Sequence, residues 1–303
     1  MKKKLRNACA WLAAMLLIRL GLTNRAKKKA INGEFILSIY FHAPSKKLFE
    51  FCVKWLIKND FHFLCQKDVY SIYKKEQPFP KRSVIITVDD GWQTNIENIV
   101  AIADKYKIPV AIFVSTEAVE NGNFWWPYIE YATKMKMINQ SVESLKKLPN
   151  KERGAIVNSV KKNIQLGRQA MTPEQIKNIS ASEYITIGSH TVTHPILTNC
   201  EDEQVYFELN TSRQKIEEWV KKEVVHFAYP NGDYGDREIK YLKDLGYILA
   251  YTIQPDYLTK QRLENIYQLP RFDIFENISN AEAICRMLGV WQSPLMKTFK
   301  GEH

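Results

Sequence analysis

The segment "IITVDDGWQT", residues 85–94, decides the predicted fold, because an apolar run ends there in two adjacent carboxylates. A short apolar run that is bounded by turn residues is typical of a buried strand in a parallel sheet. Asp89 and Asp90 follow the run, and Gly91 then turns the chain. Adjacent carboxylates raise each other's pKa unless a cation lies between them or one of them acts as a base. The pair therefore predicts a cationic partner at the end of this strand.

Strand-like and helix-like segments alternate along most of the chain. Further apolar runs predict strands at residues 35–41, 109–115, 184–189, 224–230, 247–252 and 267–274. Capping boxes predict helix starts at Thr94, Thr172 and Ser279, each with Glu or Gln three residues later. About seven strands with intervening helices predict an α/β fold, a deformed (β/α)7-type barrel that is closed or incomplete. Such barrels carry their chemistry where the strands end in loops.

Residues 119–170 interrupt this alternation. The segment contains "NFWWPYIEYATK" and then a lysine-rich stretch with a helical pattern. We therefore expect a helical insertion here, within a single catalytic domain that covers residues 30–303.

Residues 1–29 carry +9 of the formal charge of +10, which leaves +1 for the other 274 residues. The nearly neutral body argues against a nucleic-acid-binding protein. The apolar run at residues 8–18 is too short for a spanning helix, and basic residues flank it on both sides. No small-x-small cleavage site of a signal peptide follows the run. We favour a helix lying on the cytoplasmic face of the inner membrane over a signal sequence for export to the periplasm or a spanning anchor.

The cysteines also favour a reducing compartment. They are odd in number, scattered and without a C-x-x-C motif: Cys9, Cys52, Cys65, Cys200 and Cys285. We expect reduced and mostly buried thiols.

A histidine pair answers the question that the two aspartates raise. In "SHTVTHP", residues 189–195, His190 and His194 are four positions apart, so they share a face if the segment forms a turn. The aspartate pair and the histidine pair each follow a predicted parallel strand, so they converge on one face of the barrel. Two imidazoles and one carboxylate with open positions are the arrangement of a catalytic zinc site. One aspartate then binds a divalent metal, which we expect to be Zn²⁺, and the other stays free as a base.

These motifs resemble those of a known family. "TVDDGW" resembles the T-F-D-D-G motif of the polysaccharide deacetylase, or NodB-like, family, and "SHTVTHP" resembles its H-S/T-x-x-H-P motif. "HFAYPNGDY", residues 226–234, resembles the third motif, and the resemblance covers roughly residues 35–275. It implies a deformed barrel and metal-dependent removal of acetyl groups from N-acetylated sugars. By position in the motifs it implies one base and three metal ligands: Asp89 as the base, and Asp90, His190 and His194 as the ligands.

Two departures from the family pattern concern the catalytic groups. Many members have an arginine in the third motif that holds the base, where this chain has Ala228. Many have a leucine-x-histidine near the C-terminus that acts as the general acid, where this chain has Leu-Pro-Arg ending at Arg271. We expect Arg271 to supply the cation beside Asp89. His42 follows an early strand, as a histidine does in similar biofilm-polysaccharide deacetylases, and is the candidate acid. The alternative for His42 is a hydrogen-bonded strand-end residue.

Further residues near the motifs are candidates for substrate contacts. We expect a main-chain N–H near Asn231 to bind the oxyanion, and Tyr229 and Trp92 to line the site. Trp125 and Trp126 are candidates for stacking on sugar rings, with core packing as the alternative for one of them.

The sequence thus predicts an enzyme that removes an N-acetyl group from an amino sugar. The expected substrate is a bacterial surface polysaccharide or its lipid-linked precursor, met at the membrane through residues 1–29. Two alternatives remain. One is hydrolysis of an O-acetyl ester or a non-sugar amide at the same site, and the other is an inactive barrel that binds glycan.

Overall fold

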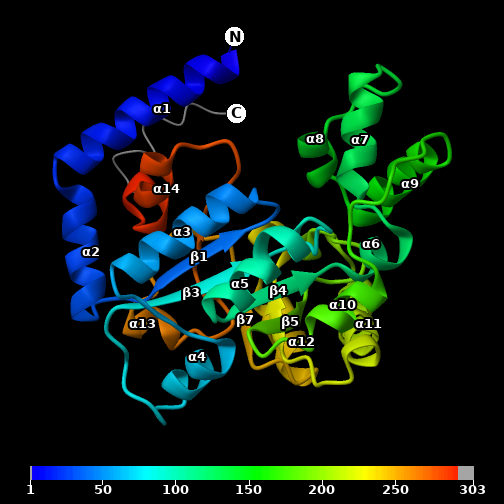
Figure 1. The fold of residues 1–303 in the computed structure, drawn as a ribbon. Helices are drawn as coiled ribbons and strands as arrows, with labels where there is room; N and C mark the ends of the chain where they lie inside the picture. Colours follow the sequence, from blue (N-terminus) through cyan, green and yellow to red (C-terminus); the bar gives the residue numbers. More distant parts are fainter. Residues whose placement is uncertain (1, 293–303) are drawn as a thin grey trace.

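A curved sheet of parallel strands forms the centre of the computed structural model, which describes residues 2–292 (Figure 1). The strands are β1 (Leu37–Phe41), β2 (His62–Phe63), β3 (Ser83–Val88), β4 (Val110–Val114), β5 (Ile185–Ser189), β6 (His226–Ala228), β7 (Leu249–Tyr251) and β8 (Phe272–Asp273). Their order is β7-β6-β5-β4-β3-β1-β8, with β2 beside β3. This is the predicted deformed (β/α)7-type barrel. The end of the predicted catalytic domain, residues 293–303, lies outside the described residues.

The last strand segment brings the two edges of the sheet together. The main-chain N–H of Leu269 donates to Ala250 of β7 at 3.0 Å. Three residues later, Phe272 of β8 is in register with Ile39 of β1. The chain therefore crosses from β7 to β1 within residues 269–273, so the first and last strands are neighbours, as expected of a barrel.

Side-chain alternation along β3 directs the first motif into the barrel. Ile85 packs in the apolar cluster that also contains Phe113 of β4, and Val84 packs with the helices outside. Successive side chains of a strand point to opposite faces, so Thr87 and Asp89 lie on the same side as Ile85. The strand thus delivers Asp89 to the barrel interior.

Helices surround the sheet. Their bounds are α3 (Lys46–Lys58), α4 (Gln66–Tyr73), α5 (Ala101–Tyr106), α10 (Pro173–Ile179), α11 (Asp202–Val220), α12 (Asp236–Asp244), α13 (Lys260–Leu263) and α14 (Asn280–Met287). The predicted caps at Thr172 and Ser279 are confirmed, since both hydroxyls accept a main-chain N–H of the first turn. The predicted cap at Thr94 is wrong, because a π-helical turn (Ile96–Val100) with no side-chain cap precedes α5. The short elements β2, α4 and α13 were not predicted.

The helices of the insertion stand together at one side of the barrel (green in Figure 1). They are α7 (Trp125–Lys134), α8 (Val142–Lys146) and α9 (Asn150–Lys161), and the short helix α6 (Thr116–Asn121) leads into them. They share a small apolar core that includes Ile129, Leu145 and Val157. This core holds the insertion together beyond the C-terminal end of β4.

The basic N-terminal segment forms two helices, α1 (Lys2–Arg19) and α2 (Leu22–Asn32), on the opposite side of the barrel from the insertion (Figure 1). Ala10 and Ala14 of α1 are buried, and α1 packs against α14. The outer face of α1 exposes large apolar side chains, Leu5, Trp11, Leu12, Met15 and Leu16, and Leu20 in the turn that follows is also exposed. Among the described residues, no helix is by itself long and apolar enough to span a bilayer, and α1 with α2 reach that length only as a pair bent by 61°.

Candidate active site

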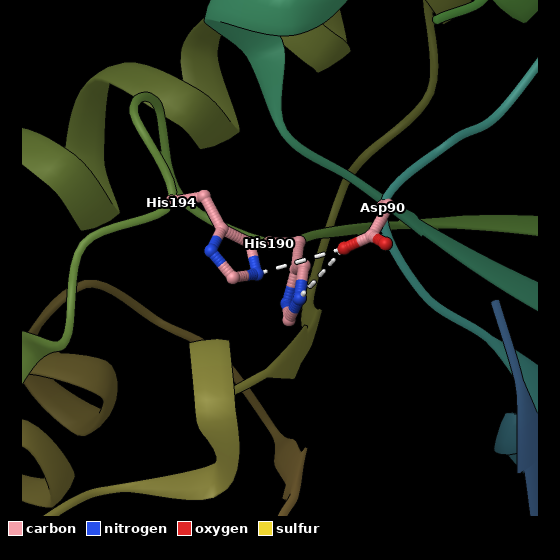
Figure 2. Close-up of side chains that lie close together, drawn as sticks. All are labelled: Asp90, His190 and His194. Carbon is pink, nitrogen blue, oxygen red and sulfur yellow. Dashed lines mark ion pairs between the residues drawn. The ribbon is translucent and has the colours of Figure 1, made fainter. Parts of the chain in front are cut away.

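Asp90, His190 and His194 meet at the C-terminal ends of β3 and β5 (Figure 2). The Oδ1 atom of Asp90 lies 3.7 Å from Nε2 of His190 and 3.5 Å from Nε2 of His194. One potential ligand atom from each residue lies within 4.8 Å of the others. The structure therefore brings together the three predicted metal ligands, which come from two separate segments of the chain.

The surroundings of these three side chains fit a divalent metal. Nδ1 of His190 lies 2.7 Å from the carbonyl of Ala228, which only accepts, so this nitrogen carries the proton and Nε2 keeps a free lone pair. Burial lowers the pKa of both histidines, which keeps the imidazoles neutral. The indole of Trp92 donates to Oδ2 of Asp90 at 2.8 Å and leaves Oδ1 free. Oriented neutral imidazoles and a hydrogen-bonded carboxylate are typical of transition-metal sites.

The main chain of the site adopts uncommon conformations. Asp90, Thr191, His194 and Asn231 have φ between 53° and 77°, in the left-handed region. Such a conformation costs about 1–2 kcal/mol for a non-glycine residue and persists only where surrounding contacts fix it. Four of these residues around one group of side chains indicate that the fold holds the site in a defined geometry.

Asp89 lies beside this group and is paired with Arg271. The guanidinium donates to both carboxylate oxygens of Asp89, at 2.8 and 2.7 Å, and also to Oγ1 of Thr87 at 2.9 Å. Both partners of the pair are buried. Burial raises the pKa of Asp89, but the charge and hydrogen bonds of Arg271 together with the electrostatic interaction with His190 outweigh this effect, so the net pKa is lowered. Asp89 is therefore ionised, and Arg271 occupies the place of the arginine that the third motif lacks.

His42 is exposed and follows β1 at the same end of the barrel. Asp273 of β8 is in register with Tyr40, two residues before His42. Burial raises the pKa of Asp273, and the charge of His42 opposes this increase. Asp273 belongs to the strand that pairs with the one that leads to His42. No local sequence pattern identifies Asp273, because its relation to His42 depends on the pairing of the first and last strands.

A cleft of about 410 Å³ opens over these residues. The predicted site residues that line it are His42, Asp89, Asp90, Trp92, Trp125, His190, His194 and Asn231. The second predicted tryptophan, Trp126 of α7, lines it too. The insertion adds residues of α7 and α8 that were not predicted: Glu130, Val142, Glu143 and Lys146. The wall of the cleft therefore comes from both the barrel and the insertion.

Tyr229 does not lie where the sequence led us to expect. Its side chain is fully buried in an apolar cluster with Phe227 and Tyr247, and its ring stacks on that of Tyr234 at 4.9 Å. It is not among the residues that line the cleft. The prediction fails because Tyr229 continues the outward-facing alternation of β6, which directs it toward α11 and α12.

The two adjacent tryptophans have different environments. Trp125 is 6% exposed, and its indole N–H donates to the carbonyl of His194 at 3.2 Å. Trp126 is half-buried, and its ring centroid lies 4.7 Å from that of His194. Trp126 thus presents more aromatic surface to the cleft than Trp125 does. A larger cavity of about 980 Å³ lies between α9 and residues 198–204, and none of the three proposed metal ligands lines it.

Comparison with known proteins gives the same assignment as the motifs. The profile of the polysaccharide deacetylase family matches residues 76–250. The poly-beta-1,6-N-acetyl-D-glucosamine N-deacetylase of Staphylococcus aureus is 27% identical over 268 residues, which cover 84% of this chain and 79% of that protein.

Solved structures share the fold. The Streptococcus pyogenes deacetylase PplD, in complex with acetate, has a TM-score of 0.61 at 18% identity and aligns over 84% of this chain and 98% of its own. IcaB from Ammonifex degensii has a TM-score of 0.60 at 14% identity and aligns over 84% of this chain and 97% of its own. The family profile covers more than half of the chain and includes all three motifs from end to end: the Asp-Asp pair, the His-x-x-x-His pair and residues 226–234. The chain therefore belongs to the polysaccharide deacetylase family.

Proposed function

We propose that the protein is a metal-dependent N-deacetylase that acts on an acetylated amino sugar of a bacterial surface polysaccharide or its lipid-linked precursor. The observation that carries this proposal is the group of Asp90, His190 and His194 beside the arginine-paired Asp89. The name of the S. aureus relative, which specifies poly-beta-1,6-N-acetyl-D-glucosamine, supports this class of substrate.

Asp90, His190 and His194 would hold the metal ion through one oxygen and two Nε2 atoms. Two imidazoles and one carboxylate suit Zn²⁺, which is the cation we expect. A divalent cation bound there supplies a Lewis acid for the acetyl carbonyl and for the attacking water.

Asp89 is the general base in this proposal. The paired Arg271 keeps its carboxylate ionised and fixes its orientation, so that it accepts a proton from the attacking water. His42 is the general acid that returns a proton to the leaving amine, and Asp273 lies on the strand paired with β1, which leads to His42. A main-chain N–H near Asn231, which lines the cleft, donates to the developing oxyanion.

The cleft suits a saccharide. It is open to solvent, and aromatic rings of Trp92 and Trp126 lie on its wall, where they offer flat surfaces to the apolar faces of a pyranose. Polar side chains of α7 and α8, such as Glu130 and Lys146, lie further out and offer partners for sugar hydroxyls.

We also propose that α1 contacts a membrane. Its outer face exposes five large apolar side chains, at 43–67% of their surface, and basic residues flank this face in the sequence. This combination is typical of a helix that lies in an anionic membrane surface. Such contact supports a lipid-linked substrate and a position at the cytoplasmic face of the inner membrane.

Acetate release tests the proposed reaction. The full chain is stripped with a chelator, reloaded with Zn²⁺ and given N-acetylglucosamine oligomers, and both acetate and free amine are measured. We expect equal amounts of the two products, no release after chelation, and recovery on addition of metal. Acetate without a new amine, from an O-acetylated glycan, would indicate an esterase instead. No release with any metal or substrate would indicate a barrel that only binds glycan.

A further inference from the structure

Two side chains of the insertion donate to the main chain of a proposed metal ligand. Nε1 of Trp125, the first residue of α7, donates to the carbonyl of His194 at 3.2 Å. Nη1 of Arg153, in α9, donates to the same carbonyl at 3.0 Å. The guanidinium carbon of Arg153 lies 4.8 Å from the centroid of the Trp125 ring. The two donors thus pack against each other and meet at one oxygen atom.

His194 has a left-handed main chain, with φ of 53°, a conformation that persists only where surrounding contacts fix it. Its N–H donates to Oγ1 of Thr191 at 3.1 Å, within the motif itself. Glu208 of α11 holds the residues between, since its carboxylate accepts the N–H groups of Val192 and Thr193. The insertion fixes the carbonyl side of His194 through these two donors, and the ring of Trp126 packs against the imidazole. Loss of these donors would free the peptide that follows the imidazole.

Arg153 is a buried arginine without a carboxylate partner among the described residues. It is 5% exposed and forms no ion pair within residues 2–292. Removing an arginine from water is unfavourable unless its charge is compensated. Here the compensation comes from the carbonyl of His194 and from the face of the Trp125 indole.

We propose that Arg153 and Trp125 are positioning residues that set the orientation of His194, so that the insertion is part of the metal site. This inference rests on the proposed metal-dependent function. It predicts that metal affinity depends on two side chains that belong to α7 and α9, outside all three sequence motifs. Groups that orient metal ligands affect affinity by about 10- to 100-fold when they are removed.

The test compares the Zn²⁺ affinity of four variants of the full chain. Arg153→Met removes the donors, Arg153→Lys keeps the charge, and Trp125→Phe removes the indole N–H but keeps a ring. Arg213→Met is the matched control, because Arg213 also donates to a main-chain carbonyl, that of Leu245, and lies over the ring of Tyr247. Competition with a chromophoric chelator gives the Kd, and thermal unfolding of the metal-free protein gives the stability.

We expect Arg153→Met and Trp125→Phe each to weaken Zn²⁺ binding about 10-fold, with Arg153→Lys in between. Arg213→Met should leave the Kd unchanged even where it lowers the unfolding temperature. A Kd within twofold of the unaltered protein in both Arg153→Met and Trp125→Phe would overturn the inference, as would an equal loss in Arg213→Met. If Arg153→Met does not fold, Trp125→Phe decides alone. If the unaltered protein does not bind Zn²⁺, or if it binds Zn²⁺ equally well after Asp90→Asn, the proposed metal site itself is wrong.

Discussion

Arg271 donates one hydrogen bond to each carboxylate oxygen of Asp89, although 182 positions separate the two residues in the chain. The contact forms because residues 269–273 cross from β7 to β1 and carry Arg271 through the seam of the barrel. It explains how Asp89 and Asp90 coexist. Asp89 is paired with a guanidinium, while Asp90 faces two imidazoles and accepts from Trp92.

Arg271 should be needed for turnover and not for metal binding. Arg271→Lys keeps a cation but loses the two-point contact, so the orientation of Asp89 is lost. We expect kcat to fall by about 100-fold or more, in the range that a positioned general base contributes. The kcat of Arg271→Met should fall further, because this variant also loses the cation. Zn²⁺ affinity should stay close to that of the unaltered protein, and an unchanged kcat in Arg271→Lys would show that the pair is only structural.

The two adjacent aspartates should separate chemistry from metal binding. Asp89→Asn should retain Zn²⁺ and lose about 10²- to 10⁴-fold in kcat, because the amide cannot accept the proton. Asp90→Asn should lose Zn²⁺, because an anionic ligand is replaced by a neutral one. Bound zinc after gel filtration and acetate release measure the two effects. Full activity in Asp89→Asn would show that Asp89 is not the base. Full zinc content in Asp90→Asn would show that Asp90 is not a metal ligand.

His226 should make the stability of the fold depend on pH. Its imidazole is buried in β6, and burial lowers its pKa to about 4. Between pH 6.5 and pH 4 the unfolded chain binds the proton more readily, so stability is full above pH 6.5 and falls toward pH 4. The difference between the pKa of about 4 in the folded protein and the ordinary histidine pKa corresponds to about 3 kcal/mol in the free energy of unfolding.

Urea unfolding at pH 7, 5.5 and 4.5 measures this effect in His226→Gln and in the unaltered protein. The variant should lose less free energy of unfolding as the pH falls. His62→Gln, at an exposed position, is the matched control and should behave like the unaltered protein. Parallel pH profiles for His226→Gln and the unaltered protein would contradict the prediction.

The outer face of α1 should determine binding to anionic lipid vesicles. Burial of one leucine contributes about 1.5–3 kcal/mol, so Leu12→Glu and Leu16→Glu should each weaken vesicle binding by at least about tenfold. Phe207→Glu is the control, because Phe207 is also a large apolar residue, 50% exposed, on α11. Co-sedimentation with vesicles that contain anionic lipid measures the binding. Equal loss in all three variants, or no loss in any, would refute a specific role for α1.

Patterns that are local in the sequence predicted the elements and the metal ligands. The cap at Thr172 formed as expected, because a capping box depends on residues three positions apart. Asp90, His190 and His194 were predicted from strand ends, since parallel strands end at the same face of a barrel. Thr94 shows the limit of such patterns, because the chain there forms a π-helical turn without a side-chain cap.

The tertiary structure decided the contacts between distant segments and the direction of individual side chains. Tyr229 follows the third-motif strand as predicted but faces the apolar layer under α11, because strand alternation directs it outward. Asp273 lies beside the strand that leads to His42 only through the pairing of β8 with β1. Arg153 meets His194 only because α9 packs beside the loop after β5. Local backbone preferences and apolar periodicity are encoded in neighbouring residues, whereas these contacts depend on how the whole barrel closes and where the insertion packs.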